Sequence, residues 1–450
     1  MNETEVGTLT RGPIFSVLAR LALPIMAASF LSTAYSITDM AWVGMLGSKA
    51  VAGIGVGGMY VWLSNGGLSA LARMGGQIHV GQALGRGDRE QAQCYASAAI
   101  QMAVLFGLAF GILCLMIPDL LISFFDLEDG VTASYAKIYL MITCGASALP
   151  FLNNTLTGLY TAQGDSTTPL KANAVGLVLN MILDPVLILG IGPFPRLEVV
   201  GAAVATVSSH LVVAVILVMM ARRNTLLRRV KLRRPAPVGC FDRIVRMGGP
   251  IALQSALYCA ISMVLTRMVA GFGEAAVAVQ RVGGQIESIT WNTSDGVGSA
   301  MNAFAAQNYG AGQPERLRKG YRIAALSMAV WGLIVGAAFV LLPETISGLF
   351  FHEAEVIPLS VSYFVIVGLS EPFMCVELMT IGTLSGLGHT KLCSAISIVV
   401  TAARIPLAYA LSAAGLGLNG IWWALTLTSA AKGILLHLVF CRTARTLPEE

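Results

Sequence analysis

The 450-residue sequence has few charged residues, few histidines and no short cysteine motif. Charged residues make up only 12% of the chain, against roughly 25% in soluble domains. The eight cysteines are scattered, mostly within apolar runs, so we expect buried, reduced thiols and no disulfide framework. The five histidines show no metal-ligand spacing, and no GxSxG, P-loop or HExxH motif occurs. We therefore expect no enzymatic activity and no bound cofactor.

What the sequence does have is long apolar runs. Hydrophobic residues make up 56% of the chain, and the runs reach the length of about 20 residues that crosses a bilayer. The net charge of +5 gives no reason to expect a nucleic-acid partner, because the position of positive charge matters more than its sum in a membrane protein. The sequence predicts an all-α polytopic membrane protein whose partner is the lipid bilayer. Twelve spans are expected near 15–43, 50–80, 92–117, 132–159, 169–190, 199–221, 243–271, 275–305, 318–343, 357–383, 390–412 and 416–440.

The sequence is also repeated. The segment GMLGSKAVAGIGVGG, residues 44–58, aligns with AGFGEAAVAVQRVGG, residues 270–284, with seven identical positions at an offset of 226. GQALGRGDRE aligns with AQNYGAGQPE at an offset of 225. Two homologous apolar halves are a common plan of secondary transporters. The repeat predicts two pseudo-symmetric six-helix lobes.

A basic linker separates the two lobes. The segment from Arg222 to Pro237 contains seven basic residues and no acidic ones, which places it in the cytoplasm. The acidic loops Asp126–Asp129 and Glu344–Glu355 fall on the opposite side. Both termini are then cytoplasmic, and the protein is expected in the cell inner membrane as a monomer. We divide the chain into an N-terminal lobe, 1–222, a linker, 223–240, and a C-terminal lobe, 241–450.

Two carboxylates lie within spans of the first lobe. Asp39 is on span one and Asp184 is on span five. A rise of about 1.5 Å per residue places them roughly 7 and 9 Å below the outer ends of their spans. Thr206 on span six lies at a comparable depth, while Asn180 and Tyr35 lie one turn below the two aspartates. An intramembrane carboxylate is costly, so it is a functional candidate by default.

This oxygen-rich level has more than one chemical interpretation. Two carboxylates, an amide oxygen and a hydroxyl suit a small hard cation such as Na⁺, with Asp39, Asn180, Asp184 and Thr206 as its ligands. They equally suit proton binding, because burial and a like-charged neighbour both favour the protonated carboxyl group. A third interpretation is structural, with each aspartate bonding a neighbouring helix.

The second lobe lacks this cluster, since Leu265 stands at the position equivalent to Asp39. Its intramembrane charges have mixed signs, which suggests internal pairing, with Glu371 and Arg404 as one candidate pair. The remaining charges include Arg267 and Arg281. The asymmetry predicts that the first lobe handles the coupling ion. Candidate substrate contacts are Tyr35, Asn154, Gln280, Glu287 and Glu377.

Several motifs together resemble the multidrug and toxic compound extrusion (MATE) family. They are TDMAWVGMLG, GQALGRGDREQA, LPFLNNTLTGLYTAQGDSTTPLKANAVGLVLNMILDPVLILG and AQNYGAGQPERLRKG. The resemblance covers almost the whole chain. It implies two six-helix lobes around an outward-facing cavity, and export of amphiphilic or cationic compounds driven by inward H⁺ or Na⁺. By motif, Asp39, Asn180, Asp184 and Thr206 match the cation site of members that carry it in the first lobe.

The sequence departs from the NorM-like branch of that family. His389 stands where that branch has an aspartate, and Tyr258 stands near where it has a glutamate. These differences favour the DinF-like branch. The predicted function is a secondary active antiporter for small amphiphilic substrates. The alternatives are a flippase or exporter of lipid-linked saccharides or another specific metabolite within the same superfamily, a membrane enzyme, and a non-transporting sensor or scaffold.

Overall fold

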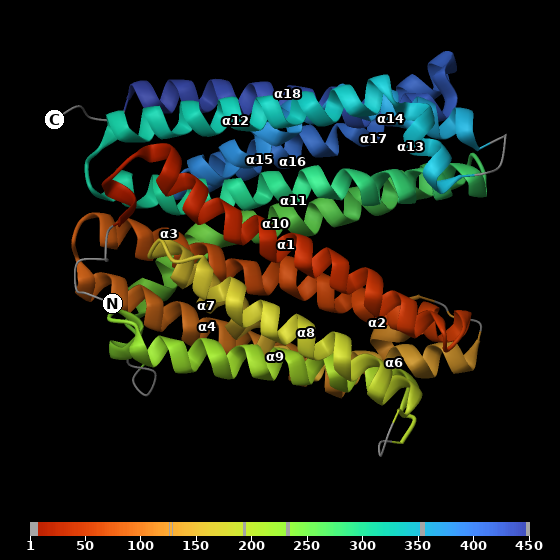
Figure 1. Ribbon diagram of the computed structural model, residues 1–450, viewed down its shortest axis with the longest axis horizontal. Helices are drawn as coiled ribbons and strands as arrows, with labels where there is room; N and C mark the ends of the chain where they lie inside the picture. Colours follow the sequence, from red (N-terminus) through yellow and green to blue (C-terminus); the bar gives the residue numbers. More distant parts are fainter. Residues whose placement is uncertain are drawn as a thin grey trace. The chain divides into compact units, whose positions relative to one another are not determined.

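The structure is a computed structural model that describes residues 8–125, 127, 129–191, 195–230, 235–351 and 356–446. All regular structure in these residues is helical (Figure 1). Residues 231–234 of the basic linker lie outside the described part, as do Asp126, Glu128 and residues 352–355 of the acidic loops.

The chain forms two compact units. Unit 1 contains Ala27–Ala252, and unit 2 contains Thr8–Met26 together with Leu253–Glu450. The sequence-based division at 222 and 241 differs from these units at two segments. Residues 8–26 belong to unit 2, and residues 241–252 belong to unit 1. Two helices, α1 (Ile14–Gly44) and α10 (Val238–Ala270), therefore each contribute to both units.

The other helices belong to one unit each. Unit 1 holds α2 (Ser48–Ser64), α3 (Ala70–Gly85), α4 (Arg89–Met116), α5 (Pro118–Ser123), α6 (Gly130–Gly145), α7 (Ala148–Ala162), α8 (Thr167–Leu189) and α9 (Glu198–Arg223), with a π-helical turn at Asn65–Ser69. Unit 2 holds α11 (Glu274–Gly310), α12 (Pro314–Leu341), α13 (Pro343–Phe350), α14 (Ile357–Gly368), α15 (Glu371–Gly386), α16 (Thr390–Ala402), α17 (Arg404–Leu411) and α18 (Gly417–Arg445), with a π-helical turn at Ser412–Leu416.

Each of the twelve predicted spans coincides with one of these helices or with a broken helix. By length and hydropathy, seven described helices can cross a membrane, or up to nine if each of two bent pairs is one span. The bends are 47° between α6 and α7 and 48° between α14 and α15, so the two halves break their fourth helix alike. The twelve-helix, two-lobe layout predicted from the sequence is confirmed.

The backbone shows why certain glycines recur in both halves. Gly47 and Gly273 precede α2 and α11 with φ of 98° and 107°, and Gly87 and Gly312 have φ of 75° and 65°. These values lie in a region that side chains with a Cβ rarely adopt. The turns between helices therefore require glycine at the same places in each repeat.

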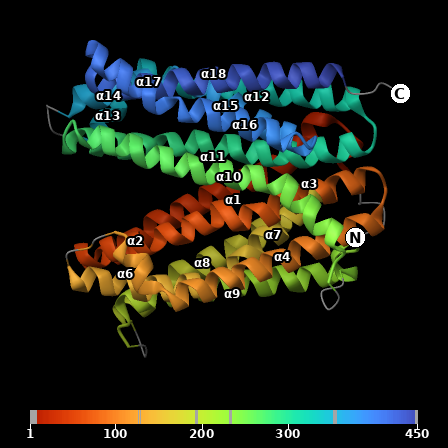
Figure 2. The same cartoon turned by 180° about the vertical axis from the view of Figure 1, so that it is seen from behind.

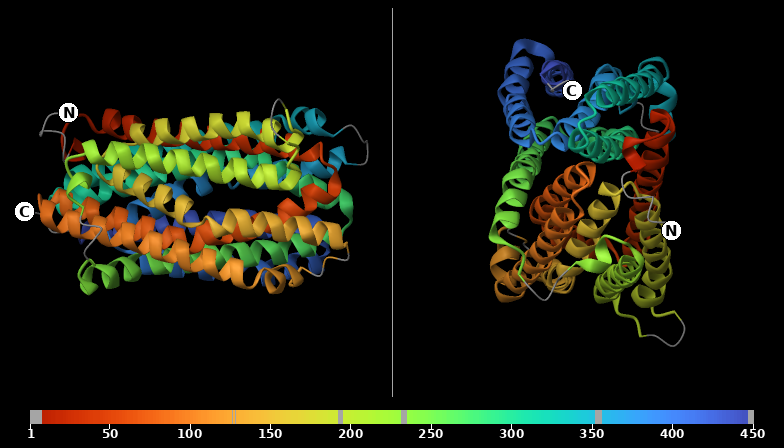
Figure 3. Two further views of the ribbon diagram at one scale, coloured as in Figure 1. Left: turned by 90° about the horizontal axis from the view of Figure 1, so that it is seen from below. Right: turned by 90° about the vertical axis from the view of Figure 1, so that its left-hand side faces the viewer.

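Within each unit the helices pack side by side. In unit 1, α8 packs on α9, α2 packs on α6, and α3 packs on α4 and α7 (Figure 2). In unit 2, α15 contacts α11, α12 and α18. The right panel of Figure 3 shows the helices nearly end-on. Small residues permit this close packing, as where Gly382 of α15 lies against the backbone of Gly298 on α11.

One glycine pair offers a test of this packing. A Cβ added at Gly248 of α10 would overlap the backbone carbonyl of Leu71 on α3, whereas a Cβ at Gly249 would meet nothing within 4 Å. Gly248→Ala is expected to destabilise the protein by about 1–3 kcal/mol. Gly249→Ala is the matched control and should be neutral or slightly stabilising, because alanine favours a helix over glycine. Thermal unfolding in detergent would measure both, and equal midpoints for the two variants would contradict the packing described.

Candidate functional site

Asp39 of α1 and Asp184 of α8 meet inside unit 1. Asp184 is fully buried, with 0% exposure, and Asp39 is half-buried. Their carboxyl groups lie within hydrogen-bonding reach of each other. Such a bond needs a donor, so it forms only when one of the two groups carries a proton. The cluster can therefore bind a proton between two side chains from different helices.

Asn180 fixes one oxygen of Asp184. The residues lie one turn apart on α8, and the Asn180 amide Nδ2 donates to Asp184 Oδ1 at 2.7 Å. The other oxygen, Oδ2, receives no hydrogen bond from a fixed donor in the described residues. A buried oxygen of this kind is costly unless a proton or a cation satisfies it. The geometry leaves Oδ2 for such a ligand.

Thr206 of α9 joins the same cluster. Its hydroxyl donates to the carbonyl of Ala202 at 3.0 Å, which leaves its lone pairs as acceptors. The phenol groups of Tyr35 on α1 and Tyr139 on α6 both lie within hydrogen-bonding reach of Thr206. Both tyrosines also lie close enough to Asp39 and Asp184 to interact electrostatically with the two carboxyl groups. Four helices of unit 1 thus supply one polar cluster.

Local sequence explains why α8 and α9 come close enough to share the cluster. A Cβ at Gly201 of α9 would stand 2.5 Å from the carbonyl oxygen of Leu187 on α8. The small residues Ala202, Ala203 and Ala205 are buried beside it. Pro185 follows Asp184 within α8 and has no N–H, so it removes one helical hydrogen bond at the level of the site.

The structure brings together all four predicted cation-site residues, with Tyr35 beside them. Sequence reasoning missed Tyr139, because a tyrosine within an apolar span gives no signal of its own. The role of this cluster in ion coupling stays a prediction.

The charges of unit 2 pair differently from the sequence prediction. Arg404 donates to the hydroxyl groups of Thr428 and Ser429 at 2.7 and 2.8 Å. Glu371 is fully buried, and neither of its oxygens has a hydrogen-bond partner in the described residues. The suggested pair of Glu371 with Arg404 is therefore wrong, because neither Glu371 oxygen lies within bonding distance of the guanidinium, which donates to Thr428 and Ser429 of α18 instead.

Glu377 has a partner that the sequence did not suggest. Its carboxylate lies 2.7 Å from the ammonium of Lys432 on α18, and the two side chains are only 5% and 7% exposed. Lys432 lies within the last span, so its charge belongs with the intramembrane charges of this unit. Glu377 is thus held in a buried ion pair rather than free to contact a substrate.

The other candidate substrate contacts are dispersed. Asn154 of α7 donates to Asn65 at 3.3 Å and to Ser69 at 3.1 Å in unit 1. Glu287 of α11 accepts from the Tyr363 hydroxyl at 3.3 Å in unit 2. The side-chain oxygen of Gln280 is buried without a hydrogen-bond partner among the described residues.

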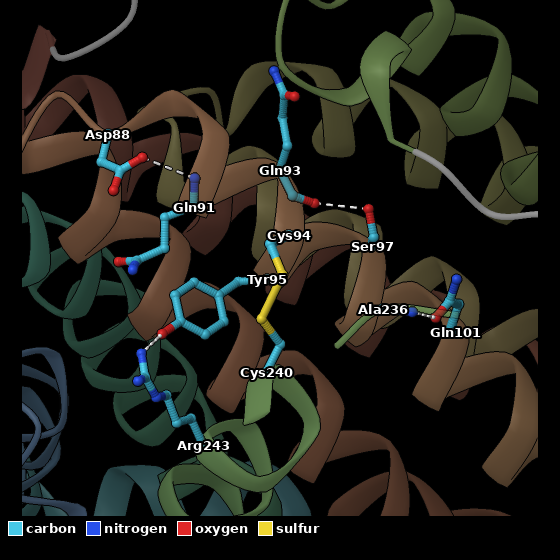
Figure 4. Close-up of a disulfide and its surroundings, with 10 residues drawn as sticks. All are labelled: Asp88, Gln91, Gln93, Cys94, Tyr95, Ser97, Gln101, Ala236, Cys240 and Arg243. Atoms are coloured by element: carbon cyan, nitrogen blue, oxygen red, sulfur yellow. Dashed lines mark hydrogen bonds between the residues drawn. A yellow bond between two sulfur atoms is a disulfide. The ribbon is translucent and has the colours of Figure 1, made fainter. Parts of the chain in front are cut away.

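The cysteines provide a further correction. The sequence predicted reduced thiols throughout, but Cys94 of α4 and Cys240 of α10 form a disulfide (Figure 4). They are separated by 146 residues in the chain. No short spacing could have indicated this pair, since only the packing of α10 on α4 brings the two sulfur atoms together.

Known proteins share both the sequence pattern and the fold. The MatE family model matches residues 24–186 and 250–410. A probable multidrug resistance protein NorM of Thermotoga maritima is 28% identical over 96% of this chain and 91% of its own length. An FAD transporter of Shewanella oneidensis is 25% identical over 78% of this chain and 77% of its own length.

Solved structures of transporters share the fold of this chain. A MOP superfamily transporter from Pyrococcus furiosus superposes with a TM-score of 0.90 at 23% identity, over 100% of both chains. An outward-facing MATE family transporter gives a TM-score of 0.90 at 24% identity, over 99% of both chains. The matched family model covers most of both halves of the sequence, and the fold is shared over the full length. The chain belongs to the MATE family of multi-pass membrane transporters.

Proposed function

We propose that the protein is a secondary active antiporter that exports amphiphilic or cationic compounds in exchange for inward-moving H⁺ or Na⁺. The observation that carries this proposal is the meeting of Asp39 and Asp184 in a buried cluster of unit 1. Relatives named as multidrug resistance and multidrug export proteins support the substrate class. The relative named as an FAD transporter indicates that substrates differ within the family.

Ion binding has a direct route to the conformation of the protein. A proton or a sodium ion neutralises charge between α1 and α8, so it favours the arrangement in which the two carboxyl groups stay close. The helix that carries Asp39 is shared, because α1 belongs to unit 2 up to Met26 and to unit 1 from Ala27. Pro24 interrupts its hydrogen bonding just before that boundary. A change at Asp39 therefore acts on a helix common to both units.

The orientation completes the proposal. We place both termini and the basic linker in the cytoplasm, in the inner membrane of a cell, and the protein acts as a monomer. Tyr35, Asn154, Gln280 and Glu287 stay as candidate substrate contacts. The first-lobe cation cluster favours the DinF-like arrangement, although the relatives described above include proteins named NorM.

A flippase for lipid-linked saccharides receives less support from the charges. Such a headgroup needs free cationic side chains. Arg404 and Lys432 are buried and already bonded within unit 2. Arg267 and Arg281 are exposed, and only these two of the four are available to a headgroup.

The coupling ion can be identified in proteoliposomes that contain the purified protein and the fluorescent cation ethidium. We expect an imposed pH gradient or an imposed sodium gradient to drive ethidium movement, whereas liposomes without protein should show none. If the protein is coupled to protons, the pH gradient should drive ethidium movement in sodium-free buffer. If it is coupled to sodium, the sodium gradient should drive ethidium movement at constant pH. If the rate of ethidium movement is the same with and without either gradient, the antiport proposal is contradicted.

A further inference from the structure

The first part of α10, residues 238–252, here named the α10 foot, is docked on α3 and α4 within unit 1. Arg243 of the foot donates from Nη1 to the Tyr95 hydroxyl of α4 at 2.7 Å (Figure 4). His79 of α3 stacks on Tyr95 with ring centroids 4.6 Å apart, and its Nε2 lies 3.2 Å from the carbonyl oxygen of Arg243. The foot is thus held by a polar contact as well as by packing.

The backbones of α3 and the foot also touch directly. A Cβ at Gly75 of α3 would stand 2.5 Å from the carbonyl oxygen of Ile244, and Gly248 lies against the carbonyl of Leu71. Ile244 is fully buried. Such close contact gives many dispersion interactions but little tolerance for sliding.

A covalent bond lies at the start of this docked segment. Cys94 is in the second turn of α4 and Cys240 is in the first turn of the foot, and they form the disulfide shown in Figure 4. Both side chains are half-buried rather than enclosed. Small thiol reagents can therefore reach the pair. Of the eight cysteines, the other six are free.

The position of the pair determines what kind of disulfide it is. Cys240 lies three residues after Pro237, the last residue of the basic segment, so the proposed orientation places the bond at the cytoplasmic surface. Cytosolic thiols are kept reduced, and disulfides that do form there are usually transient or redox-sensing. We propose that Cys94 and Cys240 form a reversible redox clamp, which holds the α10 foot on α4 and slows transport when it is oxidised. The transport effect and the cytoplasmic location rest on the proposed function, whereas the docking of the foot does not.

The chemistry needs an oxidant of the small-disulfide class, such as glutathione disulfide. The thiolate of one cysteine attacks a sulfur of glutathione disulfide, forming a mixed disulfide and releasing one glutathione thiolate. The thiolate of the second cysteine then attacks the protein sulfur of the mixed disulfide and releases the second glutathione. The two cysteines are oxidised, two glutathione molecules are formed, and the two cysteine protons pass to them. Reduced glutathione or dithiothreitol reverses both steps.

The clamp affects transport because α10 is shared. Residues up to Ala252 belong to unit 1, and the helix continues into unit 2 from Leu253. Any motion of one unit relative to the other must either bend α10 near Pro250 or loosen the foot from α3 and α4. The disulfide removes the second route, so oxidised protein must make the motion by bending alone.

The first measurement asks whether the clamp forms and what it holds. The full-length protein in detergent is treated with glutathione disulfide or dithiothreitol, denatured and labelled with a maleimide polymer. We expect two fewer labelled thiols after oxidation in the wild type and in the control Cys441→Ser, and no loss of a thiol pair in Cys94→Ser or Cys240→Ser. Hydrogen exchange of residues 238–252 should then slow by about threefold or more on oxidation.

The second measurement follows ethidium movement in proteoliposomes. Oxidation should slow it by at least about threefold in the wild type and in Cys441→Ser, because conformational steps commonly limit turnover, and dithiothreitol should restore it. Cys94→Ser and Cys240→Ser should be unaffected. Failure to lose two thiols, unchanged exchange of the foot, unchanged transport by oxidised protein, or inhibition that persists in Cys94→Ser would each overturn the clamp. If neither redox form moves ethidium, the antiport proposal fails, and the exchange of the foot still decides whether the clamp exists.

Discussion

Efflux driven by an ion gradient is expected to fall by at least about tenfold in Asp184→Asn, a change that corresponds to about 1.4 kcal/mol. Asparagine has nearly the same shape as aspartate and still offers an oxygen to the amide of Asn180, so the fold should persist. It has no ionisable group, however, and cannot exchange a proton with Asp39 or neutralise a sodium ion. Asp39→Asn should have a similar effect, because the two carboxyl groups lie within hydrogen-bonding reach of each other and form one proposed site.

The experiment compares ethidium efflux and labelled cation uptake in proteoliposomes for the two variants and a control. Asp88→Asn is a suitable control because it also removes one carboxylate. Asp88 caps α4 by accepting from the backbone of Gln91 at 2.9 Å, a task that asparagine performs equally well. The equivalent position of the second repeat is Gln313. If efflux survives both Asp39→Asn and Asp184→Asn, the assigned coupling site is wrong.

The buried ion pair of unit 2 gives the second large expected effect. Lys432→Met should destabilise the protein by about 3–5 kcal/mol, because it leaves the charge of Glu377 buried without a partner. The double variant Glu377→Met with Lys432→Met should recover most of that loss, since apolar residues of similar volume replace such pairs at little cost. Thermal unfolding in detergent measures the stability of the wild type, of Lys432→Met and of the double variant.

An exposed pair supplies the comparison. Lys137 and Asp119 lie 2.6 Å apart, as close as the buried pair, but their side chains are 38% and 80% exposed. Lys137→Met should leave the unfolding temperature nearly unchanged, because water and salt screen the interaction. A loss in Lys432→Met no larger than the loss in Lys137→Met would contradict the structural importance of the buried pair.

Much of the fold could be predicted because its determinants are local. The hydropathy of each segment identifies a span, whatever its neighbours are, since a helix satisfies its own backbone in lipid. The glycine turns at Gly47 and Gly273 recur because both repeats need the same left-handed backbone. The four cation-site residues could be grouped by depth alone, since the rise per residue of a helix is constant.

The depth of a residue along its helix does not determine which helices are neighbours or which faces they present to each other. Tyr139 could not be added to the cation cluster without knowing that α6 packs beside α9. Glu371 and Arg404 matched in depth, yet the neighbouring α18 supplies the partners of Arg404 and also Lys432 for Glu377. Lateral packing therefore decided each of these pairings.

The sequence by itself determined the membrane class, the twelve spans, the repeat and the level of the acidic pair, because hydropathy and helical rise act along the chain. Only the tertiary structure decided that α1 and α10 each belong to two units, that Lys432 neutralises Glu377, and that Cys94 meets Cys240. These features depend on contacts between residues far apart in the chain. Such contacts are set by how side chains and glycine surfaces fit together in three dimensions, which no periodicity along one helix records.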